Sequence, residues 1–146
     1  MPRIPPALPL LLDTHVWIWL MNGDREAFSN RCLKAIESAA YEGRLHVSPM
    51  AVWEIGMLVA KKRIRLGMDC LVWVQNALAV PGTHLCPLSP EIAVDSTRLP
   101  GNFHGDPADR LLVATARIMR LTLVTQDEKI LRYGEKGFVK AVPVNH

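Results

Sequence analysis

Cysteine is scarce in this sequence and is not arranged to form a disulfide or a metal site. Cys32, Cys70 and Cys86 are odd in number and widely spaced, and none belongs to a C-x-x-C pair. The 5 histidines show no H-x-x-x-H spacing either. Structural zinc sites use such closely spaced ligands, so we expect buried thiols in a reducing cytosol and no zinc.

A long apolar run is also missing. No segment approaches the ~18 uninterrupted apolar residues that a membrane-spanning helix requires. Residues 4–22 contain a single charged side chain, Asp13, but prolines interrupt this stretch and no small-residue cleavage site follows it. Both features argue against a signal peptide. We therefore expect a soluble cytoplasmic protein that does not associate with membranes.

The motifs of several large enzyme classes are not present. The sequence contains no Walker loop, no G-x-S-x-G and no G-x-G-x-x-G, which argues against a P-loop enzyme, an α/β-hydrolase and a dinucleotide-binding enzyme. Hydrophobic residues make up 49% and charged residues 21% of the chain, as in ordinary globular proteins. The formal net charge of +3 permits nucleic-acid binding without indicating it.

Short apolar runs alternate with segments of helical periodicity along the chain. The expected strands are residues 10–12, 45–47, 84–88, 121–125 and 138–142. The expected helices are residues 15–21, 30–41, 49–62, 69–78, 90–98, 108–119 and 128–132. This alternation predicts a three-layer α/β/α fold with a five-stranded parallel sheet. We expect residues 1–9 to form a proline-rich arm and residues 10–146 a single domain.

Two aspartates directly follow expected strands. Asp13 comes after the apolar run Leu10-Leu11-Leu12, and Asp127 follows the run that ends at Thr125. Ligands of open parallel sheets bind outside the carboxyl ends of the strands, where these acids are expected to lie. Each aspartate alone is explained equally well as the N-cap of the next helix.

Glu54 lies in a segment whose other residues, from Ala51 to Ala60, are all apolar or glycine. A helix that is apolar on all sides is expected to be buried, and an unpaired buried carboxylate is costly. The pattern therefore predicts a partner cation for Glu54. A salt bridge or a locally exposed face remains as the alternative.

Asp106 and Asp109 bracket the start of the next-to-last expected helix, three positions apart and on one side of a turn. Asp106 is also a good N-cap, and Asp109 could simply complement the helix dipole. Taken with Asp13, Glu54 and Asp127, however, these acids are all expected to lie at the same edge of the sheet. Unit charges ~4 Å apart repel by ~4 kcal/mol at an effective dielectric of 20, so Mg²⁺ or Mn²⁺ is the expected counter-ion.

Four motifs together resemble PIN domains, and more narrowly the VapC-like toxins of bacterial toxin–antitoxin pairs. They are Leu11-Leu12-Asp13-Thr14-His15, Ser48-Pro49 with Trp53-Glu54-Ile55, Asp106-Pro107-x-Asp109-Arg110-Leu111-Leu112, and Leu123-Val124-Thr125-Gln126-Asp127. The match runs from about Leu10 to Val142 in the family's order and spacing. The resemblance implies a five-stranded parallel sheet between helices and an acidic pocket that binds Mg²⁺ or Mn²⁺.

The resemblance also implies an activity and partners. It implies a metal-dependent endoribonuclease that forms a homodimer and is inhibited by a VapB-like antitoxin. The catalytic metal ligands carried over are Asp13, Glu54, Asp109 and Asp127, with Asp106 as a supporting acid. Substrate contacts are expected from Thr14, Thr125, Arg110 and His104, although a structural hydrogen bond also explains a loop histidine such as His104.

Two other interpretations remain open. A phosphoryl-transfer or receiver-type domain would use Asp13 as a covalent phosphate acceptor. A haloacid-dehalogenase-like site would want a second aspartate two residues later, where this sequence has His15. The other alternative is a catalytically idle PIN-like interaction module, against which the presence of all four acids argues.

Overall fold

The computed structural model describes residues 8–146, so most of the expected proline-rich arm lies outside the described residues. The five strands are β1 (Leu10–Leu12), β2 (Leu45–Val47), β3 (Thr83–Leu85), β4 (Thr122–Val124) and β5 (Ala141–Val142). They form one parallel sheet in the order β3-β2-β1-β4-β5. The predicted five-stranded parallel sheet is therefore confirmed.

Seven α-helices and one short 3-10 helix surround the sheet. They are α1 (Thr14–Met21), η1 (Arg25–Ala27), α2 (Asn30–Tyr41), α3 (Pro49–Ala60), α4 (Cys70–Leu78), α5 (Pro90–Thr97), α6 (Pro107–Met119) and α7 (Glu128–Glu135). Ser29, Ser48, Ser89 and Asp106 each accept a backbone N–H bond at a helix start, and the last three precede a proline at the first helical position.

The last strand and helix differ from the sequence prediction. Helix α7 continues to Glu135, three residues beyond the expected end, and β5 begins at Ala141 instead of residue 138. Residues after the helix close its C-terminus, because Phe138 N–H donates to Tyr133 O and Gly137 N–H donates to Gly134 O. Those residues are thus used for the helix end and are not available to the strand.

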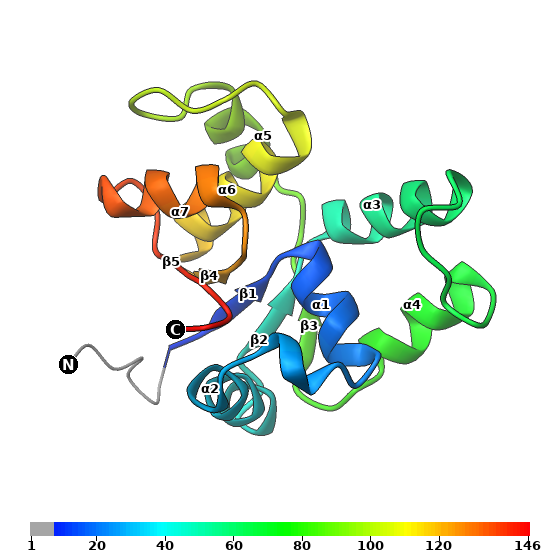
Figure 1. The fold of residues 1–146 in the computed structure, drawn as a ribbon. Coiled ribbons are helices and arrows are strands. Elements are labelled where there is room, and N and C mark those ends of the chain that lie inside the picture. Colours follow the sequence, from blue (N-terminus) through cyan, green and yellow to red (C-terminus); the bar gives the residue numbers. More distant parts are fainter. Residues whose placement is uncertain (1–7) are drawn as a thin grey trace.

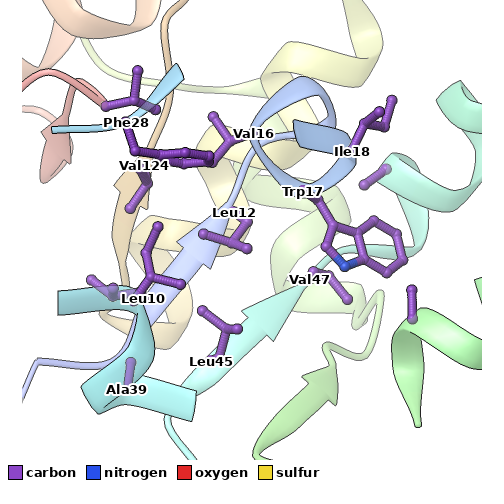
Figure 2. Close-up of a cluster of buried hydrophobic side chains, with 14 of the residues drawn as sticks. Leu10, Leu12, Val16, Trp17, Ile18, Phe28, Ala39, Leu45, Val47 and Val124 are labelled. Atoms are coloured by element: carbon purple, nitrogen blue, oxygen red, sulfur yellow. The ribbon is translucent and has the colours of Figure 1, made fainter. Parts of the chain in front are cut away.

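The alternation of side chains along β1 separates two hydrophobic layers. Leu10 and Leu12 belong to the cluster beneath α1–α4, whereas Leu11 belongs to the cluster beneath α5–α7. The two groups of helices lie on opposite sides of the sheet (Figure 1). In the first layer, Val47 of β2 lies next to Trp17 of α1, and Leu45 lies beside its strand partner Leu10 (Figure 2).

Helix α3 corrects one expectation. It was expected to be buried on all sides, but only Ala51 and Ile55 are fully buried and Trp53 is 55% exposed. Val52, Leu58 and Val59 are partly buried against the core, whereas Trp53 and Ala60 are exposed. A helix with apolar residues on all sides is therefore not fully buried within this chain.

All three cysteines are free; Cys32 and Cys86 are buried, as predicted, whereas Cys70 is only partly buried. Burial raises the pKa of each of these two thiols to about 11, so both are protonated and unreactive at neutral pH. None of the helices in the described part of the chain is long and apolar enough to cross a membrane.

Candidate active site

The order of the strands places two of the predicted acids side by side. The chain passes from β1 outward to β2 and β3, then returns to the other side of β1 as β4. In parallel sheets, the crevice where this direction reverses is the usual ligand site. Asp13 leaves the end of β1 there, and its N–H donates to Val124 O of β4 at 3.0 Å.

Thr125 links the two strand-end aspartates. Its Oγ1 donates to Asp13 Oδ2 at 2.6 Å and accepts the backbone N–H of Asp127 at 3.0 Å. Thr14 N–H donates to the other oxygen, Asp13 Oδ1, at 2.7 Å. Burial raises the pKa of Asp13, while the Thr125 and Thr14 hydrogen bonds oppose that rise. These two hydrogen bonds hold the Asp13 carboxylate in one orientation.

Asp127 caps α7 with only one of its carboxylate oxygens. The backbone N–H groups of Lys129 and Ile130 both donate to Asp127 Oδ1, at 2.8 and 3.1 Å. Neither bond involves Oδ2. Asp127 is therefore the N-cap that the sequence suggested, and its second oxygen is still able to bind another group.

Glu54 reaches the same region from α3. Within residues 8–146, its carboxylate forms no ion pair with a lysine or arginine, so the alternative of a structural salt bridge finds no support. Burial and the nearby Asp13 and Asp106 raise the pKa of Glu54 to about 7, although a hydrogen bond with Thr14 opposes the rise. An ionised Glu54 therefore lacks compensating positive charge.

Asp109 is half-buried in the first turn of α6, beside His104. The His104 Nε2 atom lies 3.2 Å from Asp109 Oδ2 but not in hydrogen-bond geometry, so this nitrogen is buried without a hydrogen-bond partner. The Asp106 N–H points to His104 Nδ1 at 3.4 Å. Burial and the carboxylates of Asp106, Asp127, Asp13 and Glu54 raise the pKa of Asp109 to about 7.

These acids line one pocket of about 390 Å³, which we call the acidic pocket; its acids are Asp13, Glu54, Asp106, Asp109 and Asp127. As the side chains stand, no three potential ligands in the described chain converge on one ion position. Asp13 is turned toward Thr14 and Thr125, and Asp109 lies beside His104. The donor set consists of carboxylate oxygens, and their raised pKa values reflect burial first and mutual repulsion second, both of which a bound hard dication would offset. The residues fit Mg²⁺ or Mn²⁺.

The predicted substrate contacts have protein partners in this structure. Thr14 and Thr125 are buried behind the carboxylates. The Arg110 guanidinium donates to the carbonyl oxygens of Ser96, Phe103 and His104 at 2.8, 3.1 and 3.2 Å. Arg110 thus ties the loop before α6 to that helix. Substrate binding by these residues and by His104 stays a prediction.

Sequence reasoning missed four residues that line the acidic pocket: Val16 and Gln126, and the aromatic pair His15 and Trp19. Both aromatic side chains project from α1, and their ring centroids lie 6.2 Å apart. The signal was available, because positions four apart on a helix that begins at Thr14 share one face.

The fold and the pocket define an α/β protein with an all-carboxylate site at the switch point of a parallel sheet. The model of the PIN domain family matches residues 10–136, and the chain belongs to this family. It is 34% identical over 121 residues to Ribonuclease VapC22 of Mycobacterium tuberculosis, a stretch that covers 83% of this chain and 88% of that protein.

Solved structures of toxin–antitoxin complexes share the fold. A VapBC2 complex of Rickettsia felis, bound to a promoter DNA fragment, matches 92% of this chain and 97% of its own with a TM-score of 0.67 at 15% identity. A toxin–antitoxin complex from Klebsiella pneumoniae matches 82% of this chain and 88% of its own with a TM-score of 0.56 at 26% identity.

Proposed function

We propose that this chain is the ribonuclease toxin of a toxin–antitoxin pair and that its acidic pocket uses Mg²⁺ or Mn²⁺ to hydrolyse RNA phosphodiester bonds. The family and the 34% identical relative, which is a ribonuclease, support the activity. The observation that carries the proposed site is that five carboxylates line one pocket and that Glu54 has no lysine or arginine partner among the described residues.

The roles of the residues follow from their positions. Asp13, Glu54, Asp109 and Asp127 would hold the cation, and Asp106 would add negative charge at the rim of the pocket. A bound dication supplies a water of lowered pKa and neutralises charge on the phosphate in the transition state. Thr125 keeps Asp13 and Asp127 in register, because it bonds to the side chain of one and the backbone of the other.

The position of Asp13 disfavours the phosphoryl-transfer alternative. A covalent phosphate acceptor needs a carboxylate oxygen that is free to attack phosphorus. Both Asp13 oxygens accept hydrogen bonds, one from Thr14 and one from Thr125. These bonds hold both oxygens in place, and the residue two positions later is His15 instead of the second aspartate that a haloacid-dehalogenase-like acceptor would want.

Partners follow from the same comparisons. The solved relatives are complexes with antitoxins, and we propose that this chain also binds a VapB-like antitoxin and forms a homodimer. Several large apolar side chains on α3 and α4 are exposed, among them Trp53, Leu71 and Val72. Exposed apolar surface of this kind supports contact with a protein partner.

A nuclease assay tests the proposal directly. Purified chain should cleave single-stranded RNA in Mn²⁺, lose the activity in EDTA, and lose it again as the Asp109→Asn variant. The product of a short open reading frame next to the gene should copurify and inhibit cleavage. A folded wild-type protein that leaves RNA intact in both Mg²⁺ and Mn²⁺ would make the chain an idle interaction module instead.

A further inference from the structure

A second cavity lies beside the acidic pocket, between α7 and the loop that precedes α6. Its volume is about 280 Å³. Cations from α7 and side chains from the loop line it; those used below are Lys129, Arg132, Lys136, Asn102, Phe103 and His104. We call this cavity the basic pocket. It contains none of the acids that form the proposed metal site.

The walls of the basic pocket are fixed by contacts with the core. The buried Tyr133 hydroxyl donates to Pro100 O, and the Tyr133 and Phe103 ring centroids lie 4.8 Å apart. Arg110 holds the carbonyls of Phe103 and His104 from the opposite side. Because the loop is tied to both α6 and α7, the cavity exists before any ligand arrives, which lowers the entropic cost of binding.

The two pockets share a boundary. His104 lines the basic pocket, and its Nε2 lies 3.2 Å from Asp109 of the acidic pocket. Helix α7 also spans both, because Asp127 caps it in the acidic pocket and Lys129 follows two residues later. A strand with one phosphate over the acids would therefore reach the basic pocket with its neighbouring nucleotides.

The charges of the basic pocket suit the phosphates that flank a cleavage site. Lys129, Arg132 and Lys136 are spaced three and four apart and so lie on one face of α7. Within the described chain, Lys129 and Lys136 form no ion pair, and the Arg132–Glu128 pair is 3.4 Å long and largely exposed. Phe103 and His104, with ring centroids 4.4 Å apart, add an aromatic wall of the kind on which unpaired bases stack.

We propose that the basic pocket binds single-stranded RNA next to the scissile phosphate. Lys129 and Lys136 contact backbone phosphates, and the Phe103–His104 wall contacts a base. This inference rests on the proposed function, since it assigns the path of the strand that the acidic pocket cuts. The flanking phosphates need such cations because the five acids would otherwise repel the strand.

A pair of double variants with the same change of charge provides the test. Lys129→Gln with Lys136→Gln removes two cations from the basic pocket. Arg120→Gln with Lys140→Gln removes two from the other end of the sheet, where these residues precede β4 and β5 and line a different cavity. The probe is a fluorescein-labelled 12-nucleotide oligouridylate, bound in Ca²⁺ and cleaved in Mn²⁺. Thermal melts establish that both variants fold.

The basic-pocket variant should bind the oligonucleotide about 5–20-fold more weakly than the matched control, and the loss in cleavage should lie in KM. Its plot of log affinity against log salt should also be shallower by about 1–1.5, because each phosphate contact on a single strand contributes ~0.7. A shorter oligonucleotide that cannot reach past His104 should bind both variants equally.

If both double variants weakened RNA binding equally, the effect would come from net charge alone, and the proposal would be overturned. Unchanged RNA binding by the basic-pocket variant would overturn it as well, including the case in which that variant loses only the copurifying antitoxin. Failure of the proposed function looks different, because wild-type protein would then bind RNA in Ca²⁺ without cleaving it in Mn²⁺. The basic pocket is judged by the binding comparison in either case.

Discussion

A single buried hydroxyl, that of Thr125, supports the two aspartates that end β1 and β4. In Thr125→Val the shape is nearly kept, but Asp13 Oδ2 and the Asp127 N–H lose their partner. Leaving such groups unpaired costs about 1–3 kcal/mol, which we expect as loss of unfolding free energy in urea titrations. The metal-induced rise in Tm should shrink as well.

Thr125→Ser is the matched control for that change, because it keeps the hydroxyl and removes a methyl group. Its metal response should remain close to that of the wild type, even though the lost methyl costs about 1 kcal/mol of packing. If the serine and valine variants lost the metal response equally, packing at this position would matter and the hydrogen bonds would not.

Replacing Glu54 is expected to raise the stability of the metal-free protein and to abolish RNA cleavage. Glu54→Gln removes one negative charge from a crowded site without stranding a lysine or arginine. In EDTA the variant should be more stable by ~1 kcal/mol, or ~3 °C in Tm, because repulsion among the acids falls. RNA cleavage in Mn²⁺ should be lost.

The exposed Glu26 of η1 provides the comparison, since Glu26→Gln should alter neither property measurably. A Glu54→Gln protein that melts several degrees below the wild type in EDTA would mean that the carboxylate has a structural partner. A stable variant that still cuts RNA would remove Glu54 from the metal site.

At the scale of elements, Arg110 joins the loop before α6 to the ends of two helices through three carbonyl oxygens. Arg110→Lys keeps the charge but not the planar fork, so about 1.5–3 kcal/mol of stability should be lost. Hydrogen exchange should accelerate in residues 99–106. Arg98→Lys, at the exposed C-terminus of α5, should leave exchange in that loop unchanged.

Elements with strong local signals were predictable, and those decided by tertiary contacts were not. The bounds expected for α2, residues 30–41, are confirmed, and they rest on local features: Ser29 caps the helix, and Cys32, Leu33 and Ile36 form its buried face. In contrast, β3 was expected over residues 84–88 but ends at Leu85. Its partner β2 has only three residues, so the ladder stops where β2 stops. The number of paired residues depends on both strands, so it cannot be predicted from the sequence of one strand.

The same distinction between local signals and tertiary contacts applies to the candidate site. Strand ends and helix starts are local features, so the four aspartates of the pocket could be predicted from their positions. Glu54 lies in the second turn of α3 and was predicted from its apolar neighbours. The approach of His104 to Asp109 depends on how Arg110 folds the loop, and no sequence spacing encodes it. The open face of α3 was misjudged because sequence does not distinguish apolar surface buried inside the chain from apolar surface left for a partner.

For the whole molecule, the site makes stability depend on pH. Glu54 and Asp109 have pKa values near 7 in the folded protein, above their ordinary values of 4.5 and 3.8. Between about pH 4 and 7 the folded state therefore holds protons that the unfolded state has released. Stability without metal should fall as pH rises through this window and level off above it.

A dication competes with those protons, so the rise in Tm caused by millimolar Mn²⁺ should be larger at pH 8 than at pH 5.5. Differential scanning fluorimetry in EDTA and in Mn²⁺ at both pH values measures this difference. The combined Glu54→Gln and Asp109→Asn variant should show neither the pH slope nor the metal response. A metal-induced shift that is greatest at acid pH would contradict the assignment of these two acids.

The strand order also has a consequence for the cell that makes the protein. Asp13 and Thr125, hydrogen-bonded to each other, are 112 positions apart in the sequence. At about 5–20 residues per second, a ribosome needs roughly 6–22 s to pass from one to the other. During that time β4 has not taken its place beside β1, and the nascent chain carries neither Asp109 nor Asp127 in a folded site. The residues of the proposed RNA-cleaving site are therefore brought together only after most of the chain has been made.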